Sequence, residues 1–248
     1  LAISIACVAI GRRHLLERAV ATPMKGPLAF RGMITLTAWI CFYTAARSLS
    51  LAQLWSLYFA APLIVTLMAA PLLGETVTRT RWLTVLLGFA GVLVVTDPWG
   101  VPLSVPTLLV LLAAAQWGYG VILMRQIARR ESSLLQMFFI NVIFLVGTGG
   151  GCAFVWQTPT PAQAVLLGLV ALVGGVAQFS LFEAARNAPA SVMATVEYSA
   201  LIWAFALGFL IWGSIPPPAT FLGAAIILSA GVVLFLGERR SARLLSVR

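Results

Sequence analysis

Long runs of apolar residues alternate with short polar segments along most of the chain. Charges and prolines divide the sequence after residue 29 into apolar stretches of about 20 residues, the length that a helix needs to cross a bilayer. The predicted spans are 30–48, 51–73, 80–97, 105–125, 133–156, 161–185, 190–213 and 218–237. Membrane β-strands alternate in polarity over about ten residues. The continuous stretches therefore predict an all-α, polytopic membrane helical bundle.

Prolines mark the breaks inside runs that carry no charge. The uncharged run 132–182 is long enough to cross twice, and two prolines within 158–161 predict its break, because proline lacks a backbone donor. Three prolines at 216–218 divide the last uncharged run in the same way. Residues 1–10 are apolar but too short to span, so we expect them to end a helix that starts before Leu1.

The composition supports a membrane protein. Apolar residues make up 61% of the chain and charged residues 9%, against about 45–50% and 25% in soluble domains. The net charge of +9 does not indicate a nucleic-acid partner, because the bases lie in short clusters between long uncharged runs. The three cysteines are scattered and the sequence has one histidine, so neither a metal site nor a cofactor is predicted.

The positions of the basic residues predict the orientation. With eight complete spans, all but one of the 16 Lys and Arg residues fall on one side of the membrane, and the exception is Arg47. Because basic loops stay in the cytoplasm, we expect a multi-pass protein of the inner membrane with a cytoplasmic C-terminus and a basic tail at 238–248.

An internal repeat appears when the chain is aligned with itself at an offset of 139 residues. Identities are few, but three consecutive spans superpose without gaps on the last three. The predicted unit is five helices, with repeats at 1–97 and 105–237, and the first repeat lacks one helix and most of a second. About eight and a half of ten helices would then be present. Because five is odd, the repeats are inverted, an architecture of alternating-access carriers with a midplane site.

Three stretches carry a resemblance to a known family. They are Ala60–Val65 continuing to Pro71–Glu75, the glycine-spaced Gly88–Leu93, and Val196–Trp203. This pattern resembles the drug/metabolite transporter superfamily, EamA type, whose members have ten helices in two inverted halves. Many members carry proline where this chain has Tyr198.

The repeat and the resemblance together predict a secondary transporter of a small organic metabolite, such as an amino acid, acting as an exporter or exchanger. The alternative is a membrane channel or a non-transporting membrane subunit. An enzyme is not expected, because the spans hold neither a nucleophile–base pair nor paired carboxylates.

Glu197 is the clearest candidate for a substrate site. It lies seven residues past Ala190, with no base within ten residues, and ionisable groups at this depth usually face the bundle interior or a cavity. It could bind a substrate amine or cation, or carry a coupling proton. The alternative is a carboxyl that joins helices.

The repeat offset adds further candidates, since it pairs Tyr58 with Glu197 and Trp39 with Gln178. In symmetric halves these residues would line one apolar pocket with few polar anchors. Alternatively, the aromatic residues form an interfacial belt and Gln178 a helix–helix hydrogen bond.

The middle of the chain supplies the remaining substrate-site candidates, and for each of them packing is the alternative role. They are Gln116, Trp117, Tyr119 and Asn141.

Arg47 and Arg186 are repeat-related and could gate the two mouths. Alternatively each is a snorkelling anchor, with Arg186 spaced to pair with Glu183. Glu75, next to Arg79 and Arg81, is expected to be structural.

Two further patterns point away from a site. The glycine-rich run 147–151 lacks the Lys-Ser/Thr of a phosphate loop, so it predicts close helix packing. The bases at 12–31 are expected to contact anionic membrane lipids.

Overall fold

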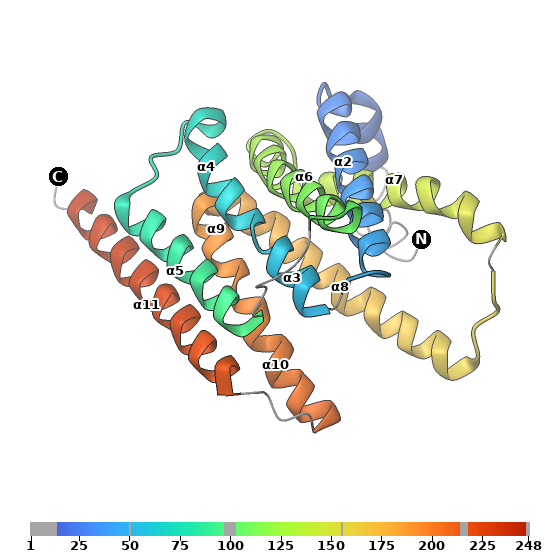
Figure 1. Ribbon diagram of the computed structural model, residues 1–248. Coiled ribbons are helices and arrows are strands. Elements are labelled where there is room, and N and C mark those ends of the chain that lie inside the picture. Colours follow the sequence, from blue (N-terminus) through green and yellow to red (C-terminus); the bar gives the residue numbers. More distant parts are fainter. Residues whose placement is uncertain (1–13, 50, 97–102, 155, 214–217, 247–248) are drawn as a thin grey trace. The chain divides into compact units, whose positions relative to one another are not determined.

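A computed structural model describes residues 14–49, 51–96, 103–154, 156–213 and 218–246 (Figure 1). This part of the chain is helical without strands, which confirms the all-α prediction. Its helices are α2 (Lys25–Ala45), α3 (Leu51–Tyr58), α4 (Ala61–Leu73), α5 (Arg79–Thr96), α6 (Val105–Ala128), α7 (Ser133–Phe154), α8 (Pro161–Asn187), α9 (Ala190–Glu197), α10 (Ser199–Trp212) and α11 (Pro218–Ser246). Residues 14–21 are also helical.

The start of α8 shows why the long uncharged run breaks where it does. Thr160 accepts a hydrogen bond from the backbone N–H of Gln163, and the Gln163 side chain accepts one from the backbone N–H of Thr160. This capping box satisfies donors that a helix start leaves unpaired, and Pro161 occupies a first-turn position where no donor is needed. The break predicted at 158–161 is confirmed.

Four helices in the described residues have the length and hydropathy to cross a membrane, as expected of a multi-pass membrane protein. They are Lys25–Ala45, Val105–Ala128, Ser133–Cys152 and Pro161–Asn187. Shorter apolar helices lie at Ala61–Leu73 and Phe221–Gly237.

Two of the predicted spans are discontinuous helices. The span 51–73 is divided between α3, which ends at Tyr58, and α4. Pro62 contributes to this break, because it cannot donate to the carbonyl four residues earlier. The span 190–213 is divided between α9, which ends at Glu197, and α10, and there is no proline inside this second break.

The chain forms two compact units, and each draws on both halves of the sequence. The first unit contains residues 1–37 and 123–188, and the second contains 38–122 and 189–248. Neither unit coincides with a predicted repeat, so the boundaries 1–97 and 105–237 stay a prediction.

In the first unit, α7 packs against α8 and against the part of α2 that includes Gly32 and Leu36. Gly32 abuts the side chain of Ile143, and Gly147 abuts that of Leu36. In both places a Cβ atom would overlap the neighbouring side chain, so the glycines allow close helix approach. Close packing, which the sequence predicted for 147–151, is thus present at Gly147, whereas the Cβ positions of the next three glycines are open.

Arg31 departs from its predicted place. It lies inside α2, is 4% exposed, and holds its guanidinium carbon 4.8 Å from the centre of the Phe182 ring. The expectation that the bases at 12–31 all face lipid headgroups is therefore wrong for Arg31, because a cation–π contact within the protein has replaced the lipid.

In the second unit, α5 and α11 pack antiparallel along each other (Figure 1). A Cβ on Gly91 would lie 2.9 Å from the Gly223 carbonyl oxygen, and one on Gly237 would lie 2.7 Å from Thr80 Cγ2. The two helices therefore run in opposite directions. The sequence offset of 139 residues aligns the first residue of α5 with the first residue of α11.

The same offset relates three further features of the second unit. It relates the break after Tyr58 to the break after Glu197. It also relates Gly74 to Gly213, and these glycines end α4 and α10 in the left-handed conformation, with φ values of 65° and 64°. It also relates Phe59 to Tyr198, and these two residues touch, with ring centres 5.9 Å apart. These features fit an approximate twofold axis between Phe59 and Tyr198.

Candidate functional site

The site centres on Glu197, at the point in the second unit where α9 ends. Its Oε1 accepts a hydrogen bond of 2.7 Å from the indole Nε1 of Trp117, and the side chain is half-buried. A hydrogen bond to a charged acceptor is among the stronger ones, so it holds one carboxylate oxygen in a defined direction.

The periodicity of α6 explains why Trp117 reaches this position. Val110, Ala113 and Trp117 are spaced at i, i+3 and i+7 and so lie on one face of the helix. Val110 and Ala113 are fully buried in a cluster that includes Phe42 and Leu54. Packing of the first two residues therefore orients α6 and directs Trp117 toward α9.

Tyr58 completes the site from α3, where the first helix break begins. The next residue, Phe59, packs against Tyr198, which follows Glu197, with ring centres 5.9 Å apart. The Tyr58 ring packs edge to face on Phe42, with ring centres 5.0 Å apart, and on Trp55, at 5.7 Å. The carboxylate thus lies beside an aromatic wall, which we define as Trp39, Phe42, Tyr43, Trp55, Tyr58 and Phe59.

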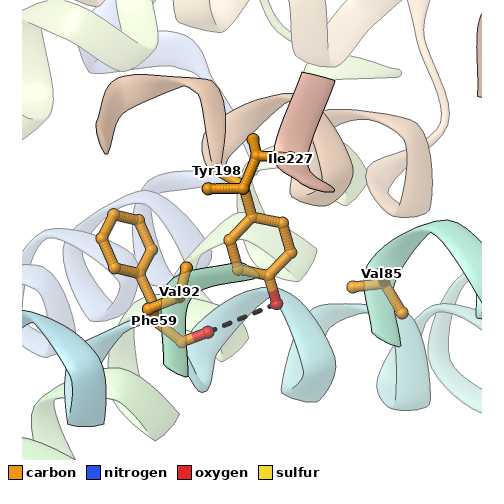
Figure 2. Close-up of a cluster of buried hydrophobic side chains, with 5 residues drawn as sticks. All are labelled: Phe59, Val85, Val92, Tyr198 and Ile227. Carbon is orange, nitrogen blue, oxygen red and sulfur yellow. Dashed lines mark hydrogen bonds between the residues drawn. The ribbon is translucent and has the colours of Figure 1, made fainter. Parts of the chain in front are cut away.

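Tyr198 follows Glu197 directly and is fully buried. Its hydroxyl donates to the backbone carbonyl of Phe59 at 3.4 Å, and its ring lies in a cluster with Val85, Val92 and Ile227 (Figure 2). This bond links the break between α9 and α10 to the break between α3 and α4. It holds the backbone next to Glu197 in place.

Tyr198 was not among the residues predicted for the site. In the sequence it appeared only as a departure from the family pattern. The available signal was the repeat offset, which pairs it with Phe59, but an offset alone does not show that two residues touch.

The opposite end of α9 is held by charged side chains. Glu75 Oε1 accepts from the backbone N–H of Ala190 at 3.0 Å, where an anion is favoured by the helix dipole. Arg81 donates to Ser191 Oγ and to the Thr76 carbonyl, both at 3.2 Å. Glu75 therefore has a structural contact, as expected, and this contact is with the start of α9.

The structure brings together only some of the predicted substrate-site residues. Glu197 and Trp117 meet at the break between α9 and α10, and Tyr58 lies at the break between α3 and α4. Gln116 and Tyr119 are half-buried neighbours of Trp117 on α6.

Trp39 belongs to the aromatic wall, is 38% exposed, and stacks on Tyr43 with ring centres 5.3 Å apart. Asn141 and Gln178 belong to the first unit, where the Asn141 side-chain amide donates to Gln178 Oε1 at 2.9 Å. This is the helix–helix bond that the sequence offered as the alternative for Gln178.

The two predicted gating residues are both exposed. Arg186 forms the expected ion pair with Glu183, at 3.1 Å, and its backbone carbonyl accepts from Arg125. Arg47 follows the end of α2. A gating role for either residue stays a prediction.

Within the described residues, His, Cys, Asp and Glu side chains do not gather into a group that could hold a metal ion. The chemistry that the site offers is therefore that of a carboxylate, an indole N–H and a phenol beside aromatic rings.

Comparison with known proteins extends over nearly the whole chain. A family model described as the EamA-like transporter family matches residues 1–97 and 105–236. The S-adenosylmethionine uptake transporter of Rickettsia bellii is 25% identical over 221 residues, which cover 88% of this chain and 73% of that protein. The riboflavin transporter of Rhizobium johnstonii is 28% identical over 192 residues, or 77% of this chain and 64% of that protein.

A riboflavin transporter of Vibrio cholerae is 24% identical over 216 residues, or 86% of this chain and 72% of that protein. A solved crystal structure of another protein covers 96% of this chain and 84% of its own, with a TM-score of 0.76 and 20% identity. At that identity the likeness concerns the fold, and it agrees with a helical membrane bundle.

Proposed function

Because the chain belongs to the EamA-like transporter family, we propose that it is a secondary carrier of a small organic metabolite, with Glu197, Trp117 and Tyr58 at its substrate site. Family membership confirms that the chain is a transporter and not an enzyme. The relatives named for S-adenosylmethionine and riboflavin both move small metabolites, which supports a cargo of this size.

The observation that carries the proposal is the hydrogen bond between Glu197 and Trp117 at a helix break. Substrate sites of secondary transporters typically lie where discontinuous helices meet near the membrane midplane. Both breaks of the second unit are near this bond, since Tyr58 ends α3 and Glu197 ends α9.

The approximate twofold axis in the second unit supports alternating access between inverted repeats. We propose that the repeats comprise residues 1–97 and 105–237, that the basic tail 238–248 faces the cytoplasm, and that the protein resides in the inner membrane. The remaining bases would contact lipid headgroups, and Glu197 could carry a coupling proton.

The direction of transport is a separate matter. The sequence predicts an exporter or exchanger, whereas the Rickettsia relative is named for uptake. Counterflow reports exchange, which a reversible carrier performs in either orientation.

The test is counterflow in proteoliposomes. Vesicles loaded with one unlabelled metabolite from a panel are diluted into the same labelled metabolite. A carrier accumulates label transiently and saturably, and we expect Glu197→Gln to lower the initial rate at least tenfold, because the Glu197 carboxylate loses its charge. The matched control is Glu17→Gln, which makes the same change at an exposed carboxylate.

Equal rates for the two variants would remove Glu197 from the site. Passage of label that neither saturates nor shows counterflow would favour a channel. No passage of any metabolite, with correctly folded protein in the vesicles, would favour the non-transporting subunit.

A further inference from the structure

We propose that this site, if it is the substrate site argued above, selects an organic cation joined to a planar aromatic group, and that it rejects substrates with an unneutralised carboxylate. The relevant cationic groups are ammonium and sulfonium. The proposal rests on the proposed function for the location of the site, and on charge and ring geometry for the class of ligand.

The first argument is the set of partners around the Glu197 carboxylate. Glu131 and Glu183 each form an ion pair with an arginine, at 3.3 and 3.1 Å. Glu197 has no ion pair with any described residue, and its single hydrogen bond is the one from Trp117 to Oε1. Its Oε2 therefore has no protein donor among the described residues and is available to a positively charged ligand.

The second argument is the position of the carboxylate on its helix. Glu197 ends α9, and Tyr58 ends α3. The C-terminal ends of discontinuous helices can coordinate cations in secondary transporters, but α10 begins at Ser199, so its positive N-terminal end offsets the negative end of α9 at this break. Arg81 is bound near Ser191, about 9 Å away along α9 at 1.5 Å per residue. The charge that a ligand meets at this break is therefore that of the Glu197 carboxylate, since the Arg81 guanidinium is held at the other end of α9.

The third argument is the aromatic surroundings. Trp117 contacts the carboxylate directly, and Tyr198, the residue after Glu197, packs on Phe59 of the aromatic wall with ring centres 5.9 Å apart. The faces of aromatic rings attract cations and stack with planar groups. A ligand that combines a positive charge with a ring would therefore use both features, whereas a carboxylate on the ligand would be repelled by Glu197.

The experiment compares four small probes that separate charge from ring. They are benzyltrimethylammonium, tetramethylammonium, benzyl alcohol and benzoate. Binding of labelled probe to the purified chain in detergent is measured by equilibrium dialysis. We expect benzyltrimethylammonium to bind at least tenfold more tightly than each of the other three, because only it has both the charge and the ring.

Variants then assign the binding to the site. We expect Glu197→Gln to weaken benzyltrimethylammonium at least tenfold and to leave benzyl alcohol unchanged. Glu17→Gln should alter neither, and Trp117→Phe should weaken the cation more than Trp203→Phe, a change at an exposed tryptophan. The probe series on the unaltered protein stays decisive even if a variant fails to fold.

Some results would overturn the ligand class and others the carrier. Benzoate or benzyl alcohol binding as tightly as benzyltrimethylammonium, or an unchanged cation affinity in Glu197→Gln, would refute the cation site. Saturable counterflow of a neutral or anionic metabolite that depends on Glu197 would also refute it, while supporting the carrier. Selective cation binding without counterflow of any solute would support the site and refute the carrier.

Discussion

The contact between Gly88 and Tyr198 gives the sharpest prediction about how the site is held. Gly88 lies on α5 and is buried, and a Cβ atom at this position would lie 2.8 Å from Tyr198 Cε2 and 3.1 Å from Cγ, with Cδ2 nearer still. Gly88→Ala therefore forces the ring to move. The ring is itself fully buried beside Val85 and Val92, so it has little space to yield.

The magnitude follows from two opposing effects. Overpacking a well-filled core costs about 1–3 kcal/mol, and a rigid buried ring places this case near the upper end. Replacing glycine by alanine inside a helix returns about 1 kcal/mol. We therefore expect Gly88→Ala to lower the free energy of unfolding by about 1–2 kcal/mol. Since Tyr198 precedes α10 directly after Glu197, counterflow should also slow.

The assay is thermal unfolding of the purified protein in detergent, followed by counterflow. The control is Gly168→Ala, at a helical glycine with nothing within 4 Å of the added Cβ, which should be neutral or stabilising. The double variant Gly88→Ala/Tyr198→Leu should be less destabilised than the sum of its two single changes, because residues in contact are coupled. The reasoning fails if Gly88→Ala melts no lower than Gly168→Ala.

Three further predictions concern the supports of the helices. Gly74→Ala and Gly213→Ala should each cost about 1–2 kcal/mol, because both glycines hold a left-handed φ, and melting curves should show two similar losses. Glu75→Ala should destabilise the start of α9 by about 1 kcal/mol, since the Ala190 N–H loses its acceptor, and hydrogen exchange at that amide should accelerate. Asn141→Leu should cost about 0.6 kcal/mol, the typical value of a hydrogen bond between membrane helices, with a correspondingly small decrease in melting temperature.

Features governed by local backbone chemistry could be predicted from the sequence. The start of α8 followed from Pro161 and its neighbours, because a missing donor acts within one turn. The ion pair between Arg186 and Glu183 followed from helical spacing alone. The all-α class followed from hydropathy, since continuous apolar stretches of that length have few other structures available in a bilayer.

Features that depend on distant partners could not be predicted. Hydropathy does not distinguish a side chain that faces lipid from one that faces protein, so the burial of Arg31 against Phe182 and of Tyr198 against α5 had no local signal. The hydrogen bond from Trp117 joins residues 80 positions apart. The sequence indicated both of its partners as polar groups at depth, but their contact depends on how α6 and α9 pack.

Phe59 and Tyr198, which meet on the approximate twofold axis, differ by one hydroxyl group. This difference has an energetic consequence for the proposed carrier. If the two halves were identical and exchanged conformations, the inward-open and outward-open forms would be degenerate, that is, equal in free energy. Here Tyr198 has a hydroxyl that bonds the Phe59 carbonyl, and Phe59 has no hydroxyl with which to return that bond when the halves trade roles. In a carrier that works in this way the missing bond would lift the degeneracy, and we expect the empty protein to have one mouth open more often than the other before any solute arrives.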